Sequence, residues 1–380
     1  MTPPAAPQGH AAVDLPVAAR VPLLVLGFLS LAAGVAAGLV RLGWDVPRPA
    51  ALDPAAHGPL MIVGFFGTVI SLERAVALAR RWAYLGPLAA GLAGVGAAFG
   101  APGTAAASAA TLAGAVLAAG SLVVLARQPA LHMACLALGA GCWLVGNVLW
   151  LAGQPVALAV PWWTGFLVLT IAGERLELTR FLPPAPRARA LFLAIVATVI
   201  GGAALALPAP EAGTLVLGTA LLALAAWLLK QDIARRTVRQ RGLTRFIAVC
   251  LLSGYFWLGL AGAIIVAAGG LVPGTASYDA ALHAVMLGFV FSMVFGHAPV
   301  IFPAVLKVAV PYTPAFYGAL AVLHASLVVR LAGDLAASYA WRAAGGMLNA
   351  LALALFIAGT AIAVARGGRG RGAGTPSAPE

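Results

Sequence analysis

Eight ionisable residues lie inside long apolar runs of this sequence, where polar groups are rare. They are five histidines and three glutamates: His57, His132, His283, His297, His324, Glu73, Glu174 and Glu177. Placing such a group inside a membrane costs about 2.5–3.5 kcal/mol, so these residues are functional candidates by default. Imidazoles bind metals and hemes, and carboxylates transfer protons. The eight positions therefore point to metal, heme or proton chemistry.

His57 and His283 are the best-matched pair of ligands. Each precedes a Gly-Phe pair in its run, His57 by seven residues and His283 by five, counted to the glycine. On two helices that run in the same direction, this is a depth difference of about 3 Å. We therefore predict that the two imidazoles hold one heme iron; the alternative is two interfacial histidines bonded to backbone or water. Met61 and Met286 follow at helical spacing and suit a heme edge or a soft metal.

A spacing of nine residues between a glycine and an ionisable group occurs three times. The instances are Gly64-Phe65 with Glu73-Arg74, Gly165-Phe166 with Glu174-Arg175, and Gly288-Phe289 with His297. We expect these side chains to form a second polar layer. Glu and Arg at adjacent positions do not face each other on a helix, so ion pairs in this layer have to form between helices. The layer is either a network that orients the helices or a relay for protons or ions.

Three histidines remain as further candidates for metal binding. His297 lies 14 residues from His283, which is about 21 Å along a helix, so these two cannot bind the same metal ion. His324 lies at a depth close to that of the first pair and is an additional or supporting ligand. One further helix stripe combines His132, Cys135 and Cys142. It predicts either a metal site or ordinary packing.

The composition requires that membrane helices position these residues. Of 380 residues, 62% are hydrophobic and only 9% are charged, whereas a soluble domain carries roughly 25% charged residues. A helix that spans a membrane needs about 20 apolar residues, and open loops cannot face lipid. The net charge of +12 does not indicate a nucleic-acid partner, because the basic residues separate apolar runs and form no single patch. We therefore predict an all-α membrane protein whose partner is the lipid bilayer.

About twelve transmembrane helices are expected from the apolar runs. They lie near residues 21–42, 57–79, 84–100, 104–126, 129–152, 156–178, 188–207, 212–230, 244–268, 279–304, 313–332 and 341–365. The run at 84–100 is the least certain because it is short. The nine-residue spacing falls in the second, sixth and tenth runs, which suggests three pseudo-repeated four-helix units. We predict one membrane domain at 21–365, with a disordered N-terminal segment at 1–20 and a disordered tail at 366–380.

The basic residues predict how the helices are oriented. With the N-terminus in the cytoplasm, 19 of the 23 Lys and Arg residues lie inside, and only Arg41, Arg48, Arg330 and Arg342 lie outside. This distribution follows the positive-inside rule. Both termini are then cytoplasmic, and we expect a bacterial inner membrane. The basic connection between Lys230 and Arg245 is interpreted as a topology determinant, with a lipid-headgroup site as the alternative.

Three short segments carry a resemblance to known families. They are HGPLMIVGF at His57, HAVMLGF at His283 and the pair Gly296-His297. With twelve spans in three groups of four, the chain resembles subunit I of the heme-copper oxidase superfamily. It is also similar to the NnrS family, heme- and copper-containing membrane proteins linked to nitric-oxide stress. The resemblance implies heme b between His57 and His283, with copper as a further metal.

The chain also departs from both families. The oxidases need a copper trio from their sixth and seventh helices, and neither of those runs contains a histidine here. Their pair of histidines two residues apart on the tenth helix is missing, because the next histidine after His283 is His297. The acidic second-helix motif of NnrS proteins and their longer spacing to Gly-His are not reproduced. A full terminal oxidase with a binuclear centre is therefore not expected.

These patterns together predict a membrane protein that binds heme, with copper as a further candidate, and acts in redox chemistry or the response to nitric oxide. Its expected partners are other respiratory or denitrification membrane proteins. A rival prediction is a proton-coupled secondary transporter that uses Glu73, Glu174 and His297. A third is a copper-delivery or assembly factor for a respiratory complex, indicated only by Met61 and Met286.

Overall fold

A computed structural model describes residues 14–178 and 185–372, and within these ranges every regular element is a helix. The second span, Pro54–Leu78, consists of η1 (Pro54–Ala56), α2 (His57–Pro59), η2 (Leu60–Gly67) and α3 (Thr68–Leu78). The tenth span, Ala276–Leu306, consists of α12 (Ala276–His283), η5 (Ala284–Phe291) and α13 (Ser292–Leu306). The other elements are α1 (Val17–Arg41), η3 (Arg81–Tyr84), α4 (Leu85–Ala98), α5 (Gly103–Arg127), α6 (Leu131–Leu151), α7 (Val156–Leu178), α8 (Pro186–Leu205), α9 (Pro210–Gln231), α10 (Ala234–Thr237), α11 (Gly242–Ala267), α14 (Phe316–Leu335) and α15 (Tyr339–Gly372).

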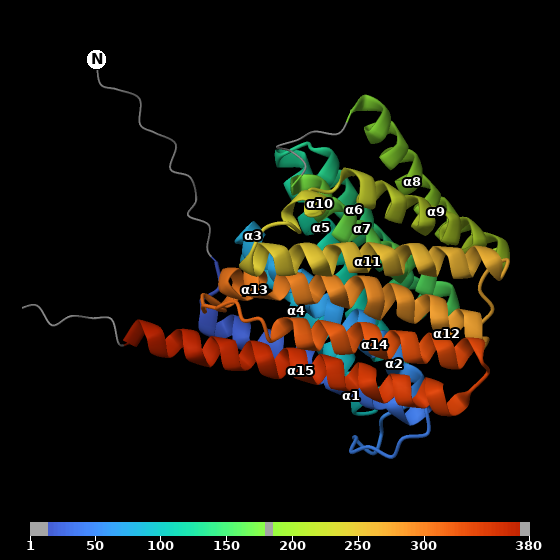
Figure 1. Cartoon of the computed structure of the whole chain (residues 1–380), viewed down its shortest axis with the longest axis horizontal. Helices are drawn as coiled ribbons and strands as arrows, with labels where there is room; N and C mark the ends of the chain where they lie inside the picture. Colours follow the sequence, from blue (N-terminus) through green and yellow to red (C-terminus); the bar gives the residue numbers. More distant parts are fainter. Residues whose placement is uncertain (1–13, 179–184, 373–380) are drawn as a thin grey trace, which may run out of the picture.

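The predicted all-α membrane architecture is confirmed. Among the described residues, eleven helices are long and apolar enough to cross a membrane. The twelfth expected span, at 84–100, is present as α4 but has only 14 residues. Such a helix is about 21 Å long and is shorter than the bilayer's hydrocarbon core of about 30 Å. Figure 1 shows α11, the tenth span, α14 and α15 lying side by side in one layer.

Three spans form the interior of the helix bundle, and we call them the central trio: the second span, α7 and the tenth span. In their most apolar 18-residue windows, 72% of residues are buried in α7, 67% in the tenth span and 61% in the second span. In the other eight membrane-crossing helices of the described chain, the share is 22–56%. The central trio consists of the three spans that share the nine-residue spacing. The repeat therefore coincides with the interior of the bundle.

The repeated glycines explain why these three spans lie inside. In each predicted four-helix unit, the glycine of the Gly-Phe pair faces the first helix of that unit. A Cβ atom would lie 2.7 Å from Ser30 of α1 at Gly64, 3.3 Å from Cys142 of α6 at Gly165, and 2.4 Å from Trp257 of α11 at Gly288. At Gly64 and Gly288 no side chain fits without displacing its neighbour. The glycines thus allow the same close helix approach in each unit.

The second and tenth spans share a further feature, a π-helical segment of eight residues. The segments η2 and η5 each begin four residues before the repeated glycine and end three residues after it. They also face each other, because the Phe65 and Phe291 rings stack with centres 5.9 Å apart and planes 5° from parallel. The third member, α7, is α-helical over its whole length. π-Helical segments are rare in proteins, and those that occur often lie at functional sites.

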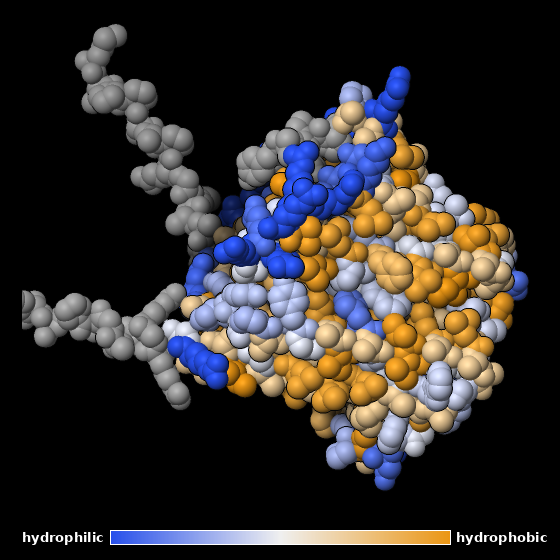
Figure 2. All heavy atoms as spheres, viewed as in Figure 1, coloured by the Kyte–Doolittle hydropathy of each residue, from blue (hydrophilic) through white to orange (hydrophobic). Residues whose placement is uncertain are grey.

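The bundle has two chemically different ends. The histidine end carries His57 and His283, and the arginine end carries Arg74, Glu174 and Arg175. Figure 2 shows hydrophilic side chains gathered around α10 and the start of α8, which belong to the arginine end, and a largely hydrophobic surface over α9 and α11. This uneven distribution of hydrophilic side chains agrees with the prediction that most basic residues lie on one side of the membrane.

The predicted domain boundaries need correction at both termini. Helix α1 begins at Val17, inside the segment 1–20 predicted as disordered, because Arg20 is buried and donates to the carbonyl oxygen of Val305 at 2.9 Å. Helix α15 continues to Gly372, past the predicted start of a disordered tail at 366. At Gly367 it approaches Pro311 so closely that a Cβ atom would lie 2.9 Å from the proline ring. Residues 1–13 and 373–380 lie outside the described residues.

Candidate functional site

The imidazoles of His57 and His283 lie together at the histidine end. Their ring centres are 6.3 Å apart and their planes are 19° from parallel. His57 begins the regular helix of the second span, and His283 ends α12 directly before η5. The structure thus brings together the two residues that the Gly-Phe register had matched. The separation is close to that of two ligands on opposite sides of one metal.

The hydrogen bonds of the two rings determine which nitrogen is available. Nδ1 of His57 donates to the carbonyl oxygen of Gly34 in α1 at 2.7 Å, and Nδ1 of His283 donates to the carbonyl oxygen of Asp279 at 2.8 Å. A carbonyl oxygen only accepts, so Nδ1 carries the hydrogen and Nε2 keeps a lone pair. Within the described residues, no further hydrogen bond involves either ring. Metal-binding histidines are commonly fixed in this way.

Glycines in α1 make room for this arrangement. A Cβ atom at Gly38 would lie 2.8 Å from Nδ1 of His57, and one at Gly34 would lie 2.7 Å from the sulfur of Met61. Met61 therefore packs against α1. Met286 is partly buried against the main hydrophobic core. Each methionine follows its histidine in the sequence and is held by packing in its own span.

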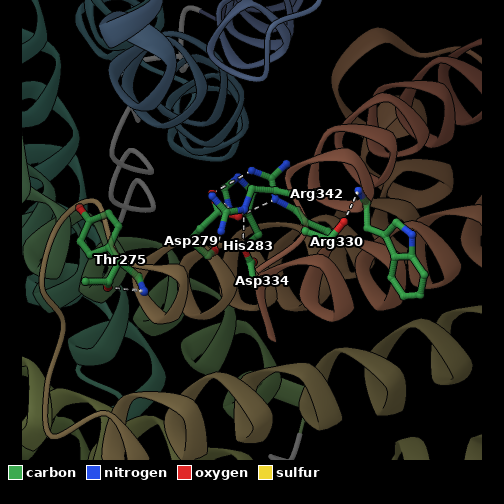
Figure 3. A network of polar contacts seen from close by, with 9 residues as sticks. Thr275, Asp279, His283, Arg330, Asp334 and Arg342 are labelled. Atoms are coloured by element: carbon green, nitrogen blue, oxygen red, sulfur yellow. Dashed lines mark hydrogen bonds and ion pairs between the residues drawn. The ribbon is translucent and has the colours of Figure 1, made fainter. Parts of the chain in front are cut away.

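Charged residues surround His283, and most of them come from α14 and the start of α15. Arg330 is only 6% exposed and donates two hydrogen bonds of 2.8 Å to the Asp279 carboxylate. One oxygen of that carboxylate lies 3.4 Å from Nδ1 of His283. Asp334 and Arg342 form a neighbouring ion pair, and Figure 3 shows these side chains converging on one spot.

Sequence reasoning missed this charged group. The sequence assigns Arg330 only to the outer side of the membrane, and Asp279 is the first residue of the apolar run 279–304. Two signals were present: Asp279 lies four residues before His283, and Arg330, inside the run 313–332, lies four residues before Asp334, just past the end of that run. At that spacing, two side chains share a helix face. An acid and a base on one buried face indicate a partner on another helix.

The predicted polar layer lies at the arginine end and links the three central spans. Arg74 of the second span donates to the Glu174 carboxylate of α7 at 2.7 Å. Arg175 of α7 donates to Nε2 of His297 in the tenth span at 2.6 Å. Both bonds run between helices, as the geometry of adjacent Glu and Arg residues requires. Glu73 lies within electrostatic reach of Glu174 and Arg74.

The hydrogen bonds of His297 and His324 differ from those of the first pair. Nδ1 of His297 donates to the carbonyl oxygen of Met293 at 2.7 Å, so both of its nitrogens have partners. His324 accepts a hydrogen bond from Nε1 of Trp257 on Nδ1 at 2.9 Å, which places the ring hydrogen on Nε2. That Nε2 is buried and has no hydrogen-bond partner among the described residues. In these states, neither His297 nor His324 offers a free lone pair to a metal ion.

The third predicted metal position, His132, stands at the second residue of α6 and is partly buried. The cysteines on its stripe pack against α7, since Cys135 donates to the carbonyl oxygen of Leu169 at 3.3 Å and Cys142 lies against Gly165. In the part of the chain that the structure describes, no group of three or more His, Cys, Asp or Glu side chains is arranged to hold a metal ion.

Comparison with known proteins gives a family without an assigned activity. A family model described as a domain of unknown function, DUF8744, matches residues 20–366. The chain therefore belongs to this family, and the match covers the whole membrane bundle. No curated protein and no solved structure matches the chain.

Proposed function

We propose that this protein is a membrane heme protein that holds heme b between His57 and His283, and that it acts in redox chemistry or in the response to nitric oxide. The observation that carries this proposal is the state of the two imidazoles. Both rings are anchored through Nδ1 on backbone carbonyls, both have Nε2 free, and they lie at the same end of two neighbouring central spans. The resemblance to the heme-copper oxidase and NnrS families supports the same site.

The distance between the rings fits one iron between them. Because a metal–nitrogen bond to histidine is about 2 Å long, two imidazoles on opposite sides of one metal have ring centres about 6 Å apart. The observed separation is 6.3 Å. Bound heme would supply one-electron redox chemistry. For a copper centre, the described residues offer no equivalent cluster, so copper is the weaker part of the proposal.

The protein's own residues have distinct tasks at this site. His57 and His283 bind, while the carbonyl oxygens of Gly34 and Asp279 orient their rings. Phe291 packs against Phe65 and Phe66 between the two π segments, and these rings exclude water on the side that faces the arginine end. The Arg330 guanidinium compensates the Asp279 carboxylate beside His283.

The experiment is a reduced-minus-oxidised spectrum of protein purified from cells supplied with heme. The wild type should have a Soret band and the α-band of a six-coordinate heme b. His57→Ala and His283→Ala should each remove it, whereas the control His132→Ala should leave it unchanged. A wild type without a Soret band, or a band that survives both His57→Ala and His283→Ala, would reject the site.

We also infer that the histidine end faces the outside of a bacterial inner membrane and that both termini are cytoplasmic. Arg41 ends α1 at this end, and Arg330 and Arg342 lie beside His283, so three of the four basic residues assigned to the outside gather here. The fourth, Arg48, belongs to the connection from α1 to the second span. Cysteine labelling at Arg48 in whole cells, with Arg239 as the opposite-side control, measures this orientation. Labelling of position 239 alone by an impermeant reagent would reverse it.

A second function, proton-coupled transport, is favoured by one observation. The polar layer joins all three spans of the central trio through the Arg74–Glu174 and Arg175–His297 contacts. In a transporter, changes in these contacts would couple proton binding to helix movement. Proton uptake into liposomes that Glu174→Gln abolishes, by protein that contains no heme, would rank this function first.

A further inference from the structure

A cavity of about 290 Å³ lies at the arginine end and shares Arg74 with the polar layer there. It is enclosed by α3, by the starts of α4 and α6, and by the last half of α5. Its size suits a small head group, since ligand pockets are about 300–1,000 Å³. The apolar part of the wall includes Leu78, Val116 and Leu136.

Both charged side chains that line the cavity are arginines. Arg74 and Arg127 line it, together with Gln128, and no acidic side chain is part of the wall. Arg74 also donates to the Glu174 carboxylate of α7 at 2.7 Å, and Glu174 does not line the cavity. Arg74 is about a quarter exposed, so nitrogen atoms of its guanidinium remain available. Two guanidinium groups without an acid in the same wall favour an anion.

A buried hydroxyl inside the cavity has no partner. Ser71 is 2% exposed, lines the cavity and lies one helical turn from Arg74, yet its Oγ forms no hydrogen bond with any residue that the structure describes. In contrast, the neighbouring Ser121 hydroxyl donates to the carbonyl oxygen of Leu117. Leaving such a group unpaired costs about 1–3 kcal/mol. A ligand oxygen at this place would remove that cost.

The cavity also adjoins the helix with the greatest lipid exposure. Only 22% of the residues in the apolar window of α5 are buried, the lowest share among the membrane-crossing helices that the structure describes. A ligand that enters beside α5 therefore comes from the bilayer. Its apolar part can stay against Val116 and Leu117 while its polar part reaches Ser71 and Arg74.

We propose that this cavity binds the phosphate head group of an anionic phospholipid, with Arg74 and Arg127 as its cationic contacts and Ser71 as a hydrogen-bond donor. The site is separate from the histidine pair and does not depend on heme. It would tie the first predicted four-helix unit, through α3, α4 and α5, to the first helix of the second unit, α6. It is also distinct from the basic connection around α10.

The test uses the full chain, delipidated in a neutral detergent, with phosphatidylglycerol or phosphatidylcholine added and bound lipid counted by native mass spectrometry. The wild type should retain one phosphatidylglycerol and be stabilised by it more than by phosphatidylcholine. Arg127→Gln should weaken this binding about fivefold, the factor expected for one arginine near anionic lipid. The matched control Arg187→Gln removes an exposed charge at the same end, on the first turn of α8, and should have no effect.

Ser71→Ala separates a ligand contact from a structural role. It should raise the melting temperature of the lipid-free protein and reduce the gain from phosphatidylglycerol, because the hydroxyl is unpaired only without ligand. Equal binding of both lipids, or equal losses in Arg127→Gln and Arg187→Gln, would overturn the proposal. Inorganic phosphate that stabilises as strongly as phosphatidylglycerol would show a free-anion site and would also overturn it.

Discussion

The histidines at the two ends of the central trio differ in whether their Nε2 atom has a hydrogen-bond partner. At the histidine end, the Nε2 atoms of His57 and His283 are free, and each Nδ1 is bonded to a backbone carbonyl. At the arginine end, His297 has the same Nδ1 contact but its Nε2 accepts a hydrogen bond from Arg175. His283 and His297 belong to the same span. A buried histidine can therefore bind a metal only if one of its nitrogens keeps an unclaimed lone pair, and of these three residues only His57 and His283 meet this condition.

The strongest test of this comparison replaces each histidine of the tenth span. His283→Ala should abolish heme binding. His297→Ala should keep the heme spectrum and destabilise the protein by about 3 kcal/mol, because Arg175 loses a buried partner. Heme titration and thermal melting measure the two effects. A loss of heme in His297→Ala at unchanged stability would mean that the two ends do not differ as described.

A second test concerns the ion pair at the arginine end. Glu174→Gln should destabilise the protein by about 2 kcal/mol, because Arg74 then has an uncharged partner in a partly buried place. Glu73→Gln is the matched control, since no hydrogen bond of Glu73 is present among the described residues. It should change stability by much less. Thermal melting of both variants in the same detergent measures the difference. Equal losses of stability would contradict the conclusion that the Arg74–Glu174 contact stabilises the layer.

A third test returns to the histidine end. Asp279→Asn should weaken heme binding about tenfold, in the range expected when a group that supports a metal ligand is changed. It should also raise the midpoint potential, because a negative charge 3.4 Å from Nδ1 of His283 favours the oxidised iron. Asp334→Asn changes the neighbouring ion pair and should leave the potential nearly constant. The proposed role of Asp279 fails if both variants shift the potential equally.

The smallest expected effect lies at the edge of the arginine end. Tyr84 donates to the Asp14 carboxylate at 2.5 Å, and burial raises the pKa of this phenol to about 12. Since the unfolded value is about 10, the stabilisation is fully present below pH 10 and is lost as the pH rises toward 12. Tyr84→Phe should cost about 1 kcal/mol at neutral pH. Melting curves from pH 7 to 11 measure it, and a difference that already disappears at pH 8 would contradict the assignment.

The sequence predicted the positions of the central residues because the nine-residue spacing is a property of the chain alone. The Gly-Phe pairs led to the pair His57 and His283, which lie together, and the nine-residue spacing led to the interhelical contacts of Arg74 and Arg175. Neither pattern led to Asp279 and Arg330, because their partnership depends on how α12 and α14 pack. The sequence also could not predict that Nε2 of His324 carries the hydrogen, since this depends on the hydrogen bond from Trp257 in another helix. Heme binding itself remains a prediction.

The two π segments have a consequence for movement in this protein. Each lies between a histidine that is free to bind and the polar layer at the opposite end, η2 in the second span and η5 in the tenth. Conversion of one segment to α-helix shifts the register, and each residue of register turns a helix by about 100°. His283 and His297 cannot both keep their present neighbours through such a turn. A rotation at one end of such a span would therefore break a contact at the other end.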